Sequence, residues 1–434
     1  MGNIKNRLNA IGLEAADIMI PRKGVDLDKW AVVACDQFTS EKDYWHDVED
    51  YVGKAPSTLK LIFPECYLED GDGDSRIEAI NRTMKEYVDQ DLFTTYPNCF
   101  FLVKRSCGSA CRWGLMAALD LDRYSWEKGS RSLIRATEGT ILSRIPPRKK
   151  IRKDAPLEIP HIMVLISDKD RTVIEPLAKA TDRLEKAYDF ELMKNGGHLE
   201  AWVVNGDSDM ENVVSAFEKL HAALDPENPL LFAMGDGNHS FATAKSCWED
   251  IKAGLTEEER KNHPARFCLV ELENIFDPGL VFEPIHRVLF NVPEEVFLEE
   301  LRKNASDVQM EKVGCRNCIA REIGDQKQQR FGYCTADKHV VVTLKNPSAA
   351  IAAGTLQKVI DALLEKGYGV DYIHGADVTD KLGSEKGNIG LFLPAIDKGT
   401  FFETIIKDGA LPRKTFSMGE ANEKRYYMEA RKIK

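Results

Sequence analysis

The sequence predicts an α/β or α+β fold built around a mixed β-sheet. Short apolar runs of strand length alternate with segments of helical periodicity along most of the chain, which is typical of mixed α and β architectures. Hydrophobic residues make up 43% of the composition and charged residues 30%, as in ordinary packed proteins. The chain has no internal repeat and no low-complexity tract, which excludes repeat and disordered architectures.

The expected strands are short runs dominated by apolar residues. They lie at 100–104, 115–119, 162–166, 201–204, 230–234, 267–270, 339–342 and 389–393, and the run 30–34 is also strand-like. Apolar residues spaced three and four apart predict helices elsewhere. These faces are formed by Ile77, Ile80, Met84, Tyr87 and Val88, by Val213, Val214, Phe217 and Leu220, and by Leu356, Val359, Ile360, Leu363 and Leu364.

A length of 434 residues corresponds to two or three domains of about 150 residues each. After the apolar run 285–288 the sequence becomes more polar and loop-rich, with Asn, Pro and Glu at 291–295. We therefore expect a main α/β domain over 1–295 and a C-terminal lobe over 296–434.

The net charge of −11 and the isoelectric point near 5.5 provide no global attraction to nucleic acid or to an anionic membrane. No run approaches the roughly 18 apolar residues of a membrane span, and the N-terminal segment lacks the layout of a signal peptide. We expect a cytoplasmic protein with a small-molecule ligand and without nucleic-acid or membrane partners. The oligomeric state is left open.

The charge is unevenly distributed along the chain. Segment 128–153, the basic island, holds nine basic residues and one acidic residue, Glu138, for a net charge of +8. Clustered Arg and Lys side chains supply charge-assisted donors, so the island predicts a phosphate or polyanion site. The alternative is a solvated segment balanced by acidic neighbours. Within the island Glu138 is a candidate base, metal ligand or ion-pair partner.

A second group of polar residues follows the apolar run 230–234. The letters GDGNHSFATAK at 235–245 read as a glycine-bearing turn and the opening of a helix. A strand, such a turn and a helix N-terminus together aim backbone N–H groups at an anion. Asp236 is then a candidate metal ligand or a partner of His239, and His239 a phosphate donor or proton-transfer group. An ordinary turn with Ser240 as helix cap is the alternative.

Asp36 and Thr39 follow the strand-like run 30–34, at the kind of strand end where α/β sites gather. An Asx-turn beside a buried cysteine is the structural alternative. Near the C-terminus, the letters KRYY from Lys424 indicate either a charged helical end or a tail that closes over a site.

Ten cysteines are too few for a disulfide framework in a chain of this length. Cys315 and Cys318, with Cys334 and His339 beyond them, have the residue types of a zinc site. A second CxxC pair does not follow, so we expect free thiols and no zinc.

Seven segments resemble the bacterial and archaeal family of unknown function numbered 1015, which is commonly labelled ParB-like. They are VDLDKWAVVACDQFTSEKDYW, APSTLKLIFPECYLE, IRATEGTILSRIPPR, GDGNHSFATAK, EPIHRVLF, VDYIHG and FSMGEANEKRYYMEAR, and they span nearly the whole chain. The resemblance implies a phosphate-binding core like that of the ParB/sulfiredoxin superfamily. That superfamily includes partition proteins that bind CTP, sulfiredoxin that uses ATP, and free-serine kinases.

The family's motif of Asp-Gly-His-His-Arg type stands here as Asp-Gly-Asn-His-Ser. Asn238 replaces a histidine, and Ser240 replaces the arginine that would contact phosphate. Lys245, or Arg135 and Arg144 from the basic island, would then supply the charge. This departure weakens the implied nucleotide site.

Glu138 matches the place where related sequences have His-Glu. In the serine kinases a glutamate is the candidate base that deprotonates the substrate hydroxyl, and the resemblance implies that role for Glu138. His286, Arg287 and His374 lie in matching segments, which makes them substrate or second-layer candidates.

Together these inferences predict an enzyme, a nucleotide-dependent kinase of a small hydroxylated metabolite such as serine or a related amino or hydroxy acid. The expected cofactors are Mg²⁺ and ATP, ADP or CTP. The candidates are Glu138, His239 and Asp36 for catalysis; Gly235, Asp236, Gly237, Asn238, Ser240, Lys245, Arg135, Thr140 and Arg144 for the phosphates; Asp36 and Asp236 for the metal; and Thr39, His286, Arg287 and His374 for the substrate.

Two other functions use the same residues. One is a nucleotide-binding switch or a ParB-like DNA-partition module, although the acidic chain shows no clear helix-turn-helix. The other is a phosphatase or hydrolase with water as nucleophile at the same anion site.

Overall fold

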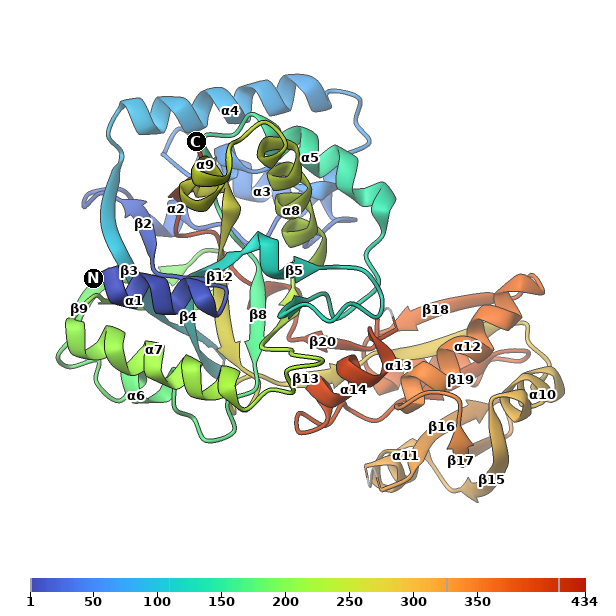
Figure 1. Cartoon of the computed structure of the whole chain (residues 1–434). Coiled ribbons are helices and arrows are strands. Elements are labelled where there is room, and N and C mark those ends of the chain that lie inside the picture. Colours follow the sequence, from blue (N-terminus) through green and yellow to red (C-terminus); the bar gives the residue numbers. More distant parts are fainter. Residues whose placement is uncertain (1, 109, 325–326, 413) are drawn as a thin grey trace. The chain divides into compact units, whose positions relative to one another are not determined.

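The computed structural model describes residues 2–108, 110–324, 327–412 and 414–434, which form two compact units (Figure 1). The first unit comprises Met1–Leu280 and Gly419–Lys434, and the second comprises Val281–Met418. The sequence placed the change of unit between 295 and 296 and did not foresee the return of the C-terminal segment. That return rests on long-range pairing, because β21 (Arg431–Lys432) is antiparallel to β7 (Leu157–Glu158).

The first unit is built on an eleven-stranded mixed sheet, which confirms the predicted α/β class. Its main path runs in the order β5, β6, β11, β8, β12, β4, β3, β10, β9, with β1 beside β4 and β2 beside β3. The strands are β1 (Leu13–Glu14), β2 (Ala16–Pro21), β3 (Phe93–Cys107), β4 (Ala110–Asp120), β5 (Tyr124–Ser125), β6 (Ile134–Arg135), β8 (Met163–Ile166), β9 (Glu185–Leu192), β10 (Gly197–Val204), β11 (Phe232–Asp236) and β12 (Phe267–Asn274). Parallel pairs occur at the β5 end and between β8 and β12.

Each face of this sheet packs against a hydrophobic core, and the side chains along each strand alternate between the two faces. On β3, Phe101 and Val103 enter one hydrophobic core, while Phe100 and Leu102 enter the other. Helices of the first unit cover both faces (Figure 1). The first core includes side chains from α2 (Leu27–Trp30), α3 (Lys42–Val52) and α4 (Gly73–Asp89), and the second includes side chains from α1 (Gly2–Ala10), α6 (Glu175–Ala178), α7 (Asp207–Ala222) and α8 (Asn238–Lys252).

Two further helices complete the first unit. They are α5 (Ile145–Lys153), which packs against α8 (Figure 1), and α9 (Glu257–Asn262). Prolines at positions 146 and 147 open α5, where their missing N–H groups cost nothing. The second half of the basic island is therefore a helix that lies along α8.

The second unit contains a six-stranded antiparallel sheet in the order β15, β17, β16, β19, β14, β18. Its strands are β14 (His286–Phe290), β15 (Ala305–Val313), β16 (Gln329–Thr335), β17 (Lys338–Pro347), β18 (Gly369–Ile373) and β19 (Ile389–Phe392), and a separate pair joins β13 (Phe282–Pro284) to β20 (Phe416–Met418). The helices are α10 (Glu294–Lys303), α11 (Arg316–Ile323), α12 (Ala352–Glu365), α13 (Ala376–Gly383) and α14 (Phe401–Asp408).

The eight runs predicted as strands fall in β3, β4, β8, β10, β11, β12, β17 and β19, and the three predicted faces in α4, α7 and α12. The run 30–34 was predicted wrongly as a strand of the sheet. Helix α2 ends at Trp30, and Val33 makes an isolated bridge to Tyr426 of the C-terminal segment. Within the described residues, none of the helices combines the length and apolar composition of a bilayer span.

Candidate functional site

The turn between β11 and α8 has the strand, glycine and helix order that the sequence predicts. Gly237 has φ +77°, and a Cβ there would lie 3.0 Å from Cγ1 and 3.1 Å from Cα of Ile162. Both the left-handed backbone and the close approach therefore require glycine. The first-turn N–H groups of α8 have no partner within the helix, which makes this end suited to an anion.

The segment that contains Glu138 is tied to this turn at two points. The backbone N–H of Thr137 donates to Oδ1 of Asn238 at 3.3 Å, and the backbone N–H of Ile141 donates to Nε2 of His239 at 3.2 Å. The Thr137 hydroxyl also donates to the Met234 carbonyl at 2.6 Å. Residues 138–140, including the candidate Thr140, therefore form a short loop held against the helix N-terminus at both ends.

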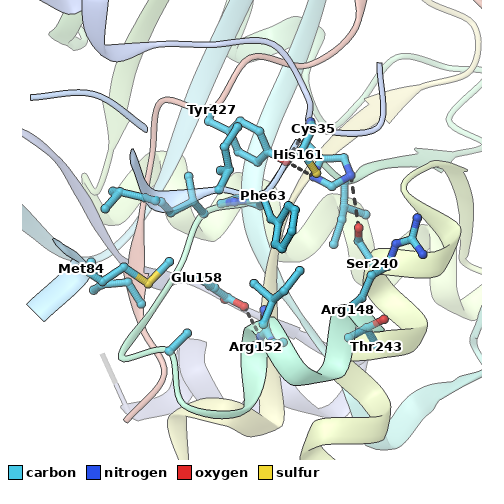
Figure 2. A pocket seen from close by; sticks show the side chains of 18 of the residues that line it. Cys35, Phe63, Met84, Arg148, Arg152, Glu158, His161, Ser240, Thr243 and Tyr427 are labelled. Carbon is cyan, nitrogen blue, oxygen red and sulfur yellow. Dashed lines mark hydrogen bonds and ion pairs between the residues drawn. The ribbon is translucent and has the colours of Figure 1, made fainter. Parts of the chain in front are cut away.

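His161 lies at the centre of a polar network beside the same turn. Its side chain is buried just before β8. Nε2 lies 3.2 Å from the hydroxyl of Ser240, and Nδ1 lies 2.8 Å from the hydroxyl of Tyr427 (Figure 2). Nε2 also lies 3.7 Å from a carboxylate oxygen of Asp36. The network joins four segments that are far apart in the sequence.

Hydrogen bonds tie both nitrogens of the His161 ring to other segments. The Tyr427 hydroxyl accepts the backbone N–H of Cys35 at 3.2 Å and also contacts Nδ1 of His161. Nε2 on the other side of the ring contacts the Ser240 hydroxyl. The imidazole is therefore held in one orientation beside the N-terminus of α8.

Asp236 is ionised beside a cation. One carboxylate oxygen accepts the N–H of Gly237 at 2.8 Å, and the other lies 3.3 Å from Nζ of Lys424. Burial raises the pKa of Asp236, but the charges of Lys424 and His161 lower it by more, so the net shift is downward. Lys424 therefore brings the C-terminal segment and one positive charge to the end of β11.

His239, by contrast, is neutral. Burial, together with the positive charges of Arg148 and Arg144, lowers its pKa to about 4, while Asp36 opposes the shift. A neutral ring is consistent with Nε2 accepting the N–H of Ile141. The imidazole thus positions the loop, and the positive charge nearby comes from the arginines.

The cations of α5 face acidic partners, as the alternative interpretation of the basic island expects. The pairs are Arg148 with Glu65, Lys149 with Asp250, Lys150 with Asp74 and Arg152 with Glu158. Arg148 also donates to the Arg144 carbonyl at 2.8 Å. A guanidinium has five N–H donors in a fixed fork, so Arg148 retains capacity for an additional anion.

A cavity of about 140 Å³ opens beside this network (Figure 2). Ser240, Thr243, His161 and Arg148 form part of its polar lining, while Phe63 lies in its apolar part. The other apolar lining residues are Leu61, Ile62, Leu68, Met84, Ile151, Ala155, Leu157, Ile159, Pro160 and Ile162. The N-terminus of α8 and an apolar cavity therefore adjoin each other in the first unit.

Asp36 and Asp236 differ as candidate magnesium ligands. Asp236 is held by Gly237 and Lys424. One oxygen of Asp36 accepts the Gln37 side-chain amide at 3.0 Å, and the other faces His161. Mg²⁺ is commonly held by one or two carboxylates together with substrate phosphates, so the half-buried Asp36 fits that donor set better.

The metal-like clusters lie elsewhere. Among the described residues, the groups of three or more His, Cys, Asp or Glu side chains close enough to share a metal are Cys334, His339 and Asp380, and Asp189, His198 and Glu200. Neither group includes Asp36 or Asp236. All ten cysteines are free thiols.

Several predicted site residues have other contacts. The Arg135 guanidinium donates to the carbonyls of Ser132, Asn228 and Pro229, which is the pattern of a buried structural arginine. Lys245 pairs with Glu249 one turn along α8. Neither residue lines the cavity. The sequence offered Lys245, or Arg135 and Arg144, as the source of positive charge; Arg148 lines the cavity, and Lys424 lies beside Asp236.

The remaining substrate candidates also lie outside the cavity lining. Thr39 is exposed. His286, Arg287 and His374 belong to the second unit, where His286 accepts the Leu393 N–H at 3.1 Å and Arg287 lies over the Tyr372 ring. Burial lowers the pKa of His286 to about 4. For His286 and Arg287 these contacts are of the kind that structural groups make.

Sequence reasoning missed four residues of the site. His161 lies shortly after the basic island, which ends at residue 153, and this proximity to a charge cluster was the available signal. Arg148 lay inside the island but was not selected. Lys424 and Tyr427 lie in the segment 424–427, which the sequence indicated to be either a charged helical end or a tail that closes over a site.

Comparison with known proteins gives one family and several distant structures. The family model described as "Protein of unknown function (DUF1015)" matches residues 19–363. No curated protein matches the chain.

Solved structures resemble the chain only distantly. A free serine kinase in complex with AMP is 10% identical at a TM-score of 0.38, covering 76% of this chain and 95% of that one. SbnI with a C-terminal truncation, from Staphylococcus aureus, is 10% identical at 0.35 and covers 72% and 82%. A conserved hypothetical protein from Pyrococcus furiosus is 10% identical at 0.33 and covers 73% and 90%. Similarity at this level by itself assigns no activity.

Proposed function

The chain belongs to the family of proteins of unknown function DUF1015, and we propose that its first unit binds a nucleotide and transfers a phosphoryl group to a small hydroxylated metabolite. The observation that carries the proposal is that the N-terminal turn of α8 adjoins an apolar cavity through Ser240. A nucleotide has the same two-part chemistry, with anionic phosphates joined to a flat, largely apolar base.

The phosphates would bind at the turn. Backbone N–H groups of residues 238–240, the Ser240 hydroxyl and the Arg148 guanidinium are all donors there, and the helix dipole favours negative charge. Arg148 is already neutralised by Glu65, so a phosphate would share that guanidinium with the carboxylate. Lys424 provides a further positive charge beside Asp236.

The base would enter the cavity. Its volume of about 140 Å³ is close to that of an engineered protein cavity of about 150 Å³ that takes benzene. Phe63 offers a ring face in a lining that is otherwise mainly aliphatic. The cavity therefore has room for one ring-sized group, and the ribose would lie between it and the turn.

For phosphoryl transfer the proposal relies on position and charge. Glu138 lies on the loop that Thr137 and Ile141 hold against the turn, and as the base it would accept the proton of the acceptor hydroxyl. Mg²⁺, which neutralises charge on transferring phosphates, would be held by Asp36. Serine or a related hydroxy or amino acid is the proposed acceptor class.

The experiment is a titration and a product assay on the purified chain. Binding of ATP, ADP, AMP and CTP is measured by calorimetry with and without Mg²⁺, and turnover is followed with and without L-serine as both phosphorylated product and free phosphate. A phosphorylated acceptor supports the kinase. Free phosphate alone identifies a hydrolase, and binding without turnover identifies a switch.

Paired variants connect the result to the site. Ser240→Ala and Arg148→Met should each weaken nucleotide binding by roughly five- to fiftyfold, because each removes a donor to a charged group. Lys153→Met removes the same type of charge from an exposed position on the same helix and should leave binding unchanged. Equal effects of Arg148→Met and Lys153→Met would refute the proposed phosphate site.

A further inference from the structure

The second unit contains a close pair of cysteines that the nucleotide site does not use. Cys315 is the residue before α11, and Cys318 lies in the first turn of that helix. Their Sγ atoms are 3.0 Å apart. Cys315 is exposed and Cys318 is half-exposed, so both thiols can meet a small molecule in solution.

The backbone already holds the two residues in a geometry that allows a disulfide. The Cys318 N–H donates to the Cys315 carbonyl at 3.0 Å, which closes the first turn of α11. Cys315 has φ −166°, an extended conformation without strain. A disulfide has an S–S length of about 2.05 Å, so the sulfurs need to approach by only about 1 Å. Side-chain rotation supplies that movement without any change of fold.

The surroundings of Cys315 favour the thiolate, which is the nucleophilic form of a cysteine. A hydrogen bond from the Cys318 thiol is the largest cause that lowers the pKa of Cys315, followed by the backbone N–H groups of Cys318 and Asn317 and the charge of Arg321. The two nearby arginines are each paired with a carboxylate, Arg316 with Asp377 and Arg321 with Glu322.

In six other cysteines the thiol pKa is shifted in the opposite direction, upward. Burial raises the pKa of Cys35, Cys66, Cys99, Cys247, Cys268 and Cys334. Cys107 and Cys111 lie in the β3–β4 hairpin and are half-exposed, which makes them internal references for accessibility. Cys315 therefore differs from these six thiols in its exposure and in the direction of its pKa shift.

We propose that Cys315 and Cys318 form a thiol–disulfide exchange site that reacts with low-molecular-weight disulfides such as oxidised glutathione. The Cys315 thiolate attacks one sulfur of the disulfide, which forms a mixed disulfide and releases one glutathione thiolate. The Cys318 sulfur, on losing its proton, attacks the Cys315 sulfur and releases the second glutathione thiolate. Two protein thiols are oxidised, one glutathione disulfide is reduced, and the two protons end on the two released glutathiones.

The test uses the full-length chain and reads out the bond itself. Reduced protein, freed of reductant, is incubated with oxidised glutathione, quenched with acid, blocked with N-ethylmaleimide and digested with trypsin. Trypsin cuts after Lys312, Arg316 and Arg321, so Cys315 falls in peptide 313–316 and Cys318 in peptide 317–321. The intramolecular disulfide is therefore seen by mass spectrometry as a covalent pair of two short peptides.

We expect this linked pair to become the main form of both peptides before Cys107 or Cys111 exchanges, and its yield to be independent of protein concentration. Cys318→Ser should abolish the pair and trap one glutathione on Cys315. Cys315→Ser should slow adduct formation at this site by roughly fivefold or more. Cys107→Ser, the control, should leave the yield unchanged.

Two results would overturn the proposal. One is recovery of both peptides as N-ethylmaleimide adducts under oxidised glutathione, at a level no different from Cys107 and Cys111. The other is a stable glutathione adduct on Cys315 of the unaltered chain without any linked pair, which would show that Cys318 does not resolve it. Both measurements are independent of nucleotide binding.

Discussion

The hydroxyl of Tyr427 lies 2.8 Å from Nδ1 of His161, although the two residues are 266 positions apart. Through this contact the C-terminal segment fixes the orientation of the imidazole that faces Ser240. The same hydroxyl accepts the N–H of Cys35, so one oxygen links three segments of the first unit.

Tyr427→Phe should therefore affect both stability and binding. Loss of the hydroxyl leaves two buried polar groups without a partner, which should lower the free energy of unfolding by about 1–3 kcal/mol. We also expect nucleotide affinity to fall by roughly fivefold, because the ring of His161 is freed to rotate. Urea unfolding and calorimetry measure the two effects. Tyr333→Phe, which removes a hydroxyl bonded to Glu294 in the second unit, should lower stability and leave affinity unchanged.

Gly237→Ala should lower the free energy of unfolding by about 2–4 kcal/mol. The left-handed backbone costs a non-glycine residue about 1–2 kcal/mol, and the contact of the new Cβ with Ile162 adds to it. Gly129→Ala is the matched control, because Gly129 has φ +81° with open space around it. Equal losses from the two variants would show that the approach to Ile162 is not tight.

Glu138→Gln tests the proposed base while keeping the shape of the side chain. If Glu138 accepts the hydroxyl proton, turnover should fall by roughly 10²-fold or more with nucleotide binding retained. If it is a metal ligand instead, the Mg²⁺ dependence should change. Glu127→Gln, an exposed position on the preceding segment, is the control. A variant that loses thermal stability but keeps normal activity per folded molecule would remove Glu138 from the chemistry.

The neutral state of His239 predicts an acid-sensitive component of stability. Its pKa falls from the ordinary 6.5 to about 4 on folding, so between these values the unfolded chain binds a proton that the native chain does not. The free energy of unfolding should therefore decrease as the pH falls from 6.5 to 4.

His239→Gln should reduce this slope, since glutamine stays neutral and its oxygen can accept the Ile141 N–H. His286 has the same direction of shift, so a double variant with His286→Gln should flatten the slope further. Unfolding by urea at several pH values measures the slopes. Parallel curves for all three proteins would contradict the assignment of neutral rings.

Glu273 predicts a component of stability that decreases as the pH rises, which is opposite to the effect of His239 and His286. Burial raises its pKa from the ordinary 4.5 to about 8, with Glu271 and Asp277 adding to the shift and Arg112 opposing it. Between pH 4.5 and 8 the native chain holds a proton that the unfolded chain releases, so this group makes stability fall as the pH rises.

Glu273→Gln keeps the neutral shape and should remove that dependence. The variant should match the unaltered chain near pH 5 and exceed it in stability near pH 8, as measured by urea unfolding. Glu258→Gln, at an exposed position, is the control and should follow the unaltered chain. A variant that is less stable at every pH would show that the carboxylate of Glu273 is ionised against Arg112.

The sequence by itself determined the fold class, the positions of eight strands and the glycine turn that precedes α8. These are local properties: alternation along strands, helical spacing, and a glycine that directly precedes a helix are all present within a few residues. Gly237 is an example, because the turn it makes depends on its own backbone freedom and on the strand and helix on either side. Local patterns fail for the apolar run 30–34, which is not a strand of the sheet, since the bridge it makes is to the distant Tyr426.

Only the tertiary structure decided which charged groups complete the site. Arg135 and Arg148 belong to the same basic island, yet Arg135 is bound by backbone carbonyls and Arg148 lines the cavity. Lys424 and Tyr427 reach the site from the other end of the chain. Charge and hydrogen bonding act over a few ångströms in space whatever the separation along the chain, so the partners of these residues are set by how the C-terminal segment returns to the first unit.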